Sequence, residues 1–182
     1  ALLDQLKLRR VTLIGHSMGG YVGLCFAKSY ERNLKGLCLL NSTAQSDSEE
    51  RKKLRLRACK LAQHNYEGLL KMSISNLFGP QSSAVLLKEI ESVKQDALRT
   101  PLQGYMAAAK GMCLRENQEQ VLKTIPKRLF IAGDDDPILS LSSLKAEARR
   151  TETPIVTVPH GHMSHIESKT LVIRYLKEFL NS

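Results

Sequence analysis

Four short apolar runs stand out along the chain, and none shows the polar–apolar alternation of a half-exposed strand. They cover residues 11–15, 36–40, 129–132 and 155–158. Continuous apolar runs of this length are typical of parallel strands that are buried on both faces. Apolar residues at helical spacing lie in between, in residues 2–8, 18–30 and 167–180. This alternation predicts an α/β fold with a mainly parallel sheet covered on both faces.

The segment between the second and third apolar runs has a different pattern. Residues 43–124 contain no strand-like run, and their apolar spacing predicts helices near 49–63, 66–77, 84–97 and 102–114. Gly79-Pro80 and Thr100-Pro101 mark the breaks between them. We therefore predict a helical cap at 43–124, inserted into a core formed by 1–42 and 125–182.

The most informative motif follows the first apolar run and reads Gly15-His16-Ser17-Met18-Gly19. A G-x-S-x-G pattern between a strand and a helix predicts a sharp turn that exposes a nucleophilic serine, here Ser17. We expect both glycines, Gly15 and Gly19, to be required because a Cβ on either would crowd the turn. The backbone N–H of Met18, at the start of the helix, is the predicted donor to an oxyanion.

A serine nucleophile needs a base, and the base needs an acid to orient it. Asp134, Asp135 and Asp136 follow the third apolar run, and His160, His162 and His165 follow the fourth. The carboxyl ends of parallel strands lie at one edge of a sheet, so these groups are expected near the serine. The order serine, acid, histidine is that of an α/β-hydrolase triad. Spacing alone leaves open which aspartate and which histidine take part.

Three segments together resemble the α/β-hydrolase superfamily: Gly15-His16-Ser17-Met18-Gly19-Gly20, Gly133-x-x-Asp136-Pro137 and Gly161-His162-Met163. Within it, the chain is similar to the capped esterase and lactonase-like group that includes enol-lactonases and cofactor-free haloperoxidases. The resemblance implies that Asp136 is the acid and His162 the base.

Other residues have alternative roles. Asp47, just past the second apolar run, is an alternative acid, because some relatives place the acid there; its other interpretation is an N-terminal acid of the first cap helix. His16 is expected to pack in the elbow and His64 to lie at the surface. The resemblance also implies that the first strands of the sheet and the second oxyanion donor precede the elbow. Only ten residues stand before Val11, so we expect both to be absent from this chain.

Composition narrows the choice of partners. The net charge is +9, and the densest basic cluster comprises Arg51, Lys52, Lys53, Arg55, Arg57 and Lys60. Two interpretations stay open for this cluster, a solvated helix face or a surface for an anionic ligand. Five Tyr, four Phe and no Trp offer little for base stacking, which argues against a nucleic-acid partner. We also expect no membrane partner.

The cysteines and histidines argue against a metal or disulfide protein. Four widely spaced cysteines without a C-x-x-C pair match neither a zinc site nor a disulfide framework, and they favour a cytoplasmic location. The histidine spacing fits no metal motif, so we expect neither a metal nor a cofactor.

The residues and the resemblance together predict a serine hydrolase that cleaves an ester, lactone or thioester of a small molecule through an acyl-serine intermediate. Apolar cap residues are candidates for substrate contact: Leu69, Leu70, Met72, Leu77, Phe78, Met106 and Met112. The alternatives are a non-catalytic hydrolase-like fragment or binding module, and a C–C bond hydrolase or acyltransferase that uses the same triad.

Overall fold

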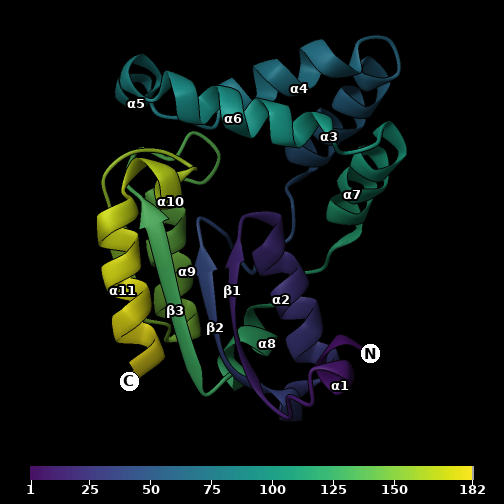
Figure 1. The fold of residues 1–182 in the computed structure, drawn as a ribbon. Coiled ribbons are helices and arrows are strands. Elements are labelled where there is room, and N and C mark those ends of the chain that lie inside the picture. The colour runs from purple at the N-terminus through teal and green to yellow at the C-terminus, as the bar shows by residue number, and fades with distance from the viewer. Residues whose placement is uncertain (182) are drawn as a thin grey trace.

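The computed structural model describes residues 1–181, and its centre is a parallel sheet of four strands (Figure 1). The strands are β1 (Val11–His16), β2 (Leu34–Leu40), β3 (Lys127–Gly133) and β4 (Ile155–Val158), and they lie side by side in that order. Each pair of neighbours is parallel. All four strands predicted from the apolar runs are confirmed, with ends that differ by at most two residues.

Helices cover both faces of the sheet because each central strand sends apolar side chains to both sides. On one face Leu37, Leu39 and Phe130 pack against α2 (Met18–Ser29), α8 (Glu119–Thr124) and α9 (Leu141–Thr151). On the other face Cys38 and Ile131 pack against α11 (Lys169–Asn181). Side chains that point alternately to two apolar layers explain why the strands read as continuous apolar runs.

Five helices between β2 and α8 form a layer above the carboxyl ends of the strands (Figure 1). We call them the cap helices: α3 (Glu49–Ala62), α4 (Tyr66–Ser75), α5 (Pro80–Val85), α6 (Leu87–Leu98) and α7 (Leu102–Leu114). The single helix predicted near 84–97 is two helices, which meet at Leu86 in a non-helical conformation. Helix α8 lies within the range predicted for the cap, yet it packs on the core against α2 and α9.

The remaining elements are short. Helix α1 (Leu2–Gln5) ends earlier than the predicted 2–8, and Lys7 has a positive φ of 53°. A 3₁₀ turn covers Glu31–Asn33, and α10 (Ser164–Glu167) precedes α11. None of the described helices is both long and apolar enough to cross a lipid bilayer.

A buried carboxylate fixes the segment that leads from β2 into the cap. Glu147 of α9 is fully buried and accepts hydrogen bonds from Thr43 Oγ1 (2.5 Å), the Ala44 N–H (2.6 Å) and Gln45 Nε2 (3.1 Å). The segment is thereby tied to the core before it enters α3.

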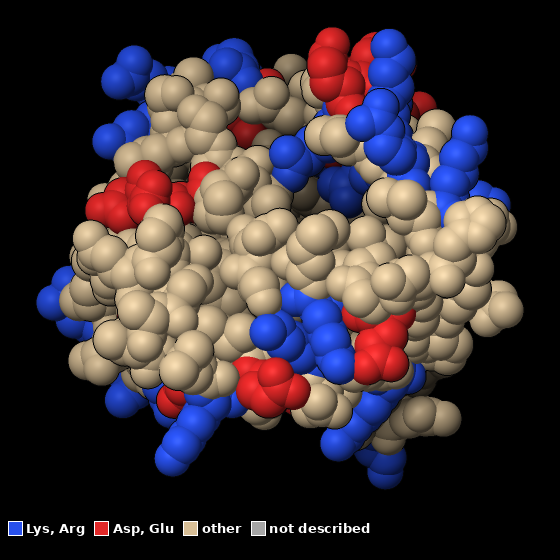
Figure 2. Space-filling view, turned by 90° about the horizontal axis from the view of Figure 1, so that it is seen from above, with Lys and Arg blue, Asp and Glu red and all other residues tan. Residues whose placement is uncertain are grey.

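Seen from above, Lys and Arg side chains surround a hollow on the cap side of the molecule (Figure 2).

Candidate active site

The turn between β1 and α2 holds Ser17 in a backbone conformation that few residues adopt. Ser17 has φ 50° and ψ −117° and stands directly before the first residue of α2. Such strain costs about 1–3 kcal/mol and persists only where the surroundings impose it. Here the end of β2 does so, because the Ser17 N–H donates to the Leu40 carbonyl (3.0 Å) and Ser42 Oγ donates to the Ser17 carbonyl (2.7 Å).

The glycines around Ser17 differ in what they allow. A Cβ on Gly15 would lie 2.5 Å from the Cα of Gly20, so strand and helix can approach this closely only at a glycine. A Cβ on Gly20 would lie 2.7 Å from the Cβ of Ser42. A Cβ on Gly19 would meet nothing within 4 Å. The expected crowding at Gly19 is therefore wrong, and Gly20 is the second glycine that the packing requires.

The structure brings Ser17, His162 and Asp136 together in one line of hydrogen bonds. His162 Nε2 lies 2.8 Å from Ser17 Oγ, and His162 Nδ1 lies 2.8 Å from Asp136 Oδ2. The side chains of His162 and Asp136 are 3% and 0% exposed, so the bond between these two residues is shielded from water. The three residues follow β1, β4 and β3, whose carboxyl ends share one edge of the sheet.

The Asp136 carboxylate is fully bonded, which fixes its orientation. Oδ1 accepts from the N–H groups of Ile138 (2.8 Å) and Leu139 (3.1 Å), and Oδ2 accepts from Asn41 Nδ2 (3.0 Å) as well as from His162. Burial alone would raise the pKa of Asp136. The hydrogen bond and charge of His162 and the bonds from Asn41 and Ile138 outweigh it, so the pKa lies below its usual value. The carboxylate therefore stays ionised beside the histidine.

Asn41 is a part of the site that the sequence analysis missed. It is fully buried at the end of β2, with a positive φ of 44° that asparagine tolerates better than most residues. Its Nδ2 also donates to the Gly161 carbonyl (3.2 Å), and its Oδ1 accepts from Ser164 Oγ. One side chain thus joins the acid to the loop that carries His162. The one available signal was a polar residue directly after a buried strand.

Cap residues hold the loop of His162 from above. The His162 N–H donates to the Leu77 carbonyl (3.0 Å), and the Gly79 N–H donates to Glu167 Oε1 (2.9 Å). Glu167 Oε2 also accepts from the Met163 N–H (3.1 Å). A Cβ on Gly161 would lie 2.7 Å from the backbone nitrogen of Gly79. The base is therefore fixed by the cap and the core together.

His16 supports this loop from below. Its Nε2 lies 2.8 Å from the His162 carbonyl, an acceptor, so this nitrogen carries the proton. Its ring lies 5.3 Å from that of His162 and 4.5 Å from that of His165, measured between centroids. Burial is the main reason why the pKa of His16 falls to about 4. His16 is therefore neutral at pH 7.

The other candidate residues have different partners. Asp134 Oδ1 accepts from the His160 N–H (2.9 Å), and Asp135 is exposed. Asp47 pairs with arginines rather than with a histidine, and His64 is exposed. No cluster of three or more His, Cys, Asp or Glu within residues 1–181 is arranged to hold a metal ion.

A cavity of about 590 Å³ lies between the core and the cap, beside the nucleophile. Met18, the residue after Ser17, lines it together with residues of α3 and α7. No partner for the Met18 N–H is found in the described chain, and this group stands at the positive end of the α2 dipole. Of the apolar cap residues predicted to contact substrate, Met112 lines this cavity, whereas Leu69, Leu70 and Phe78 are buried.

Comparisons with known proteins identify the family of the chain. A model described as "Alpha/beta hydrolase family" matches residues 1–174, and the chain belongs to this family. A thermophilic esterase from Thermogutta terrifontis, solved with malate bound, is 31% identical, with a TM-score of 0.90 over 99% of this chain and 68% of the esterase. The fold class predicted from the sequence is thereby confirmed.

Two further proteins show how broad the likeness is. The enol-lactonase from Burkholderia xenovorans LB400 has the same fold at 21% identity, with a TM-score of 0.88 over 100% of this chain and 69% of the lactonase. A Bacillus subtilis (strain 168) protein with the provisional name 2-succinyl-6-hydroxy-2,4-cyclohexadiene-1-carboxylate synthase is 28% identical over 195 residues, which are 100% of this chain and 69% of that protein. The chain thus spans about two thirds of the length of these proteins.

Proposed function

We propose that this hydrolase-family chain carries the catalytic residues of a serine esterase, which cleaves an ester, lactone or thioester through an acyl-serine intermediate. One observation carries the proposal: His162 lies 2.8 Å from Ser17 Oγ on one side and 2.8 Å from the buried Asp136 on the other. The 31% identical Thermogutta terrifontis esterase and the shared fold of the enol-lactonase support the choice of an ester-type bond.

In the proposed first step, Ser17 Oγ attacks the carbonyl carbon while His162 Nε2 takes the hydroxyl proton. Asp136 accepts from His162 Nδ1–H, which keeps the lone pair on Nε2 and stabilises the imidazolium that forms. The carbonyl oxygen becomes an oxyanion, and the Met18 N–H is the proposed donor to it. Collapse of the tetrahedral intermediate expels the alcohol or thiol, which receives its proton from His162.

In the second step, water replaces the leaving group. His162 Nε2 removes a proton from the water, and the resulting hydroxide attacks the Ser17 acyl ester. A second tetrahedral intermediate releases the carboxylic acid, and the proton returns to Ser17 Oγ. Asp136 remains ionised in both steps because its pKa lies below the usual value.

Covalent labelling tests the proposal directly. We expect a fluorophosphonate probe to label the 182-residue chain at Ser17, with the site identified by mass spectrometry. Labelling should disappear in Ser17→Ala and persist in Ser29→Ala, which changes an exposed serine on the same helix. A folded chain that stays unlabelled under conditions that label a known serine esterase would refute catalysis by this chain.

Turnover then separates hydrolysis from the other reactions open to the same triad. Hydrolysis of 4-nitrophenyl butyrate with a burst of one nitrophenolate per labelled site would support the acyl-serine route. Labelling without ester turnover would favour a transferase or a C–C bond hydrolase, the alternatives that share the nucleophile. Neither labelling nor turnover would favour a binding module.

A further inference from the structure

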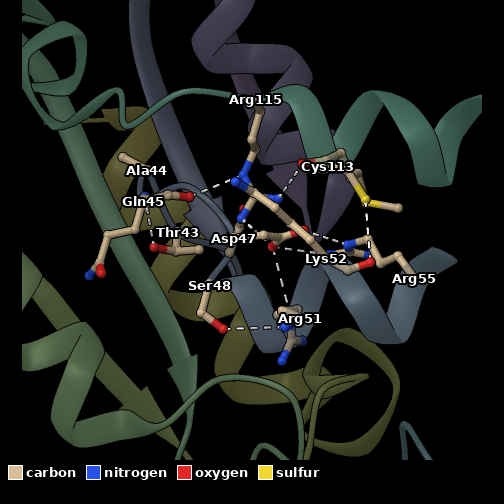
Figure 3. A network of polar contacts seen from close by, with 12 residues as sticks. Thr43, Ala44, Gln45, Asp47, Ser48, Arg51, Lys52, Arg55, Cys113 and Arg115 are labelled. Atoms are coloured by element: carbon tan, nitrogen blue, oxygen red, sulfur yellow. Dashed lines mark hydrogen bonds and ion pairs between the residues drawn. The ribbon is translucent and has the colours of Figure 1, made fainter. Parts of the chain in front are cut away.

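A buried aspartate surrounded by three arginines lies where the chain enters and leaves the cap (Figure 3). Asp47 has 1% of its side chain exposed. Arg55 Nε lies 2.6 Å from Asp47 Oδ2, Arg115 Nη2 lies 3.0 Å from Oδ1, and Arg51 Nε lies 4.0 Å from Oδ1. The predicted acid at the start of α3 is thus the centre of a cluster that carries more positive than negative charge.

The guanidinium groups of the three arginines differ in how many of their hydrogen-bond donors have partners. Arg115 is 9% exposed, donates to two backbone carbonyl groups and lies with its guanidinium 3.7 Å from the centroid of the Tyr21 ring. Arg55 directs two of its nitrogens at Asp47. The ion pair of Arg51 with Asp47 is the longest of the three, at 4.0 Å, and no hydrogen bond of the Arg51 guanidinium is found within residues 1–181. Arg51 therefore retains donors for a further partner.

A second buried carboxylate beside the cluster, that of Glu147, does not remove this excess charge. Glu147 lines the neighbouring hollow with Arg51 and Arg115. Its oxygens are occupied by Thr43, Ala44 and other neutral donors, and it forms no ion pair in the described chain. Three guanidinium groups thus share the single charge of Asp47 in a partly buried place.

Arg51 and Arg55 also line the cavity beside the nucleophile. Figure 2 shows basic side chains within the hollow on this side of the molecule. Apart from these two arginines the cavity wall is largely apolar, with Leu54, Ala58, Ala109 and Met112 among its residues. A substrate whose reacting carbonyl lies at Ser17 would extend past Met18 into this space.

The basic cluster of the sequence therefore divides into two parts. Lys53, Arg57 and Lys60 are exposed and Lys52 pairs with Glu49 of the same helix, which fits a solvated helix face. Arg51 and Arg55 turn toward the cavity and Asp47, which fits the other interpretation, a site for an anionic ligand.

On the basis of the esterase function proposed above, we infer that the cap cavity selects substrates with a carboxylate at the far end of the acyl chain, which Arg51 binds. The apolar wall accommodates a methylene spacer, and the carboxylate gives the Arg51 guanidinium, whose side chain is 33% exposed, a close partner of opposite charge. A neutral acyl chain of equal size would cover the Arg51 guanidinium without giving it a partner, which disfavours that chain. Arg51 is in this proposal the residue that determines specificity.

Matched substrates test the inference. The 4-nitrophenyl monoesters of adipate and suberate carry a distal carboxylate on spacers too long for rapid self-cleavage. Their controls replace that carboxylate by a carboxamide of nearly the same size. We expect kcat/KM to favour the carboxylates by roughly 10- to 100-fold, as for one charge-assisted hydrogen bond. This preference should shrink as salt is added.

Variants of residues in α3 show whether Arg51 causes the preference for the carboxylate substrates. Arg51→Gln should reduce the carboxylate-to-carboxamide ratio to near one, and Arg51→Lys should restore part of it because the charge returns without the planar fork. Arg57→Gln removes the same charge from an exposed position of α3 and should leave the ratio as it is. Fluorophosphonate labelling of each variant shows whether its site is assembled.

The outcomes separate this inference from the proposed function. Labelling of Ser17 with equal turnover of both substrate classes would overturn the inference and leave the esterase proposal standing. If the chain is not labelled, ligand-observed NMR with hexanoate and hexanamide replaces turnover. Hexanoate-selective binding that Arg51→Gln abolishes would then support the anionic site alone, and equal binding of both would overturn it.

Discussion

Replacement of Asp136 by asparagine tests the proposed triad atom by atom, because each oxygen of this carboxylate has its own partners. Oδ1 accepts from two backbone N–H groups, those of Ile138 and Leu139. An asparagine can satisfy both only by keeping its oxygen in that place. Its NH₂ group then takes the place of Oδ2, where it faces His162 Nδ1 and Asn41 Nδ2.

The consequence for the base follows from this orientation. An NH₂ group beside His162 Nδ1 favours the tautomer in which Nδ1 accepts and Nε2 carries the proton. A protonated Nε2 cannot take the proton of Ser17. Loss of the correct tautomer in serine-protease triads costs about ten-thousand-fold in kcat, or about 5 kcal/mol of barrier. In the same variant the NH₂ group of Asn41 faces the NH₂ group of the new asparagine instead of an acceptor, which costs a further ~1–3 kcal/mol of stability.

The assay is kcat/KM for 4-nitrophenyl butyrate together with the rate of fluorophosphonate labelling. We expect Asp136→Asn to lose about ten-thousand-fold in turnover while urea unfolding shows a folded protein. Asp135→Asn is the matched control, because this neighbouring aspartate is exposed, and it should stay within about twofold of the parent. Activity of Asp136→Asn within about tenfold of the parent would refute the assignment of the acid.

Three further features of the structure, the glycines of the elbow, the buried Glu147 and the buried His16, give predictions for stability. Gly15→Ala should destabilise by ~3 kcal/mol or prevent folding because its Cβ meets backbone, whereas Gly19→Ala, with open space around its Cβ, should stabilise by about 0.5–1 kcal/mol in urea unfolding. Glu147→Ala leaves the Ala44 N–H and two side-chain donors unpaired and should cost about 3 kcal/mol, with Glu147→Gln closer to the parent in the same urea titration. The pKa of His16 is about 4 in the folded chain against an ordinary value of 6.5, so the free energy of unfolding should fall as the pH falls from 6.5 to 4. His16→Gln should flatten this part of the curve, and an unchanged slope would contradict a buried neutral imidazole.

Helices and strands were predictable from the sequence where the positions that are buried in the fold are also apolar residues. The strands are apolar on both faces, so each of β1 to β4 appears in the sequence as a continuous apolar run. Helix α9 was not predicted, because it buries Glu147 among its apolar positions and the pattern does not show that this carboxylate is paired. Helix α1 was predicted too long. Its C-terminal end lies next to Lys7, which has a positive φ, and the sequence has no glycine there to indicate a helix end.

The site was predictable to a smaller extent. The motif and the strand ends placed Ser17, the three aspartates and the histidines at one edge of the sheet, and the family resemblance singled out Asp136 and His162. Their catalytic roles stay predictions, although the geometry brings the three residues together. Asn41 could not be found, because its partners lie about one hundred residues away in the chain and only the folded sheet joins them.

The contact between Leu77–Gly79 and the loop of His162 limits how readily the cap of this chain could be exchanged for another. A cap that could be exchanged as a module would meet the core only through its two connecting segments. Here a stretch in the middle of the cap supplies the acceptor for the His162 N–H and packs against Gly161. A chimera that imports a foreign cap would therefore exchange part of the support of the base along with the binding cavity. New specificities should arise more readily by point substitution in α3 and α7, which line the cavity and leave that contact intact.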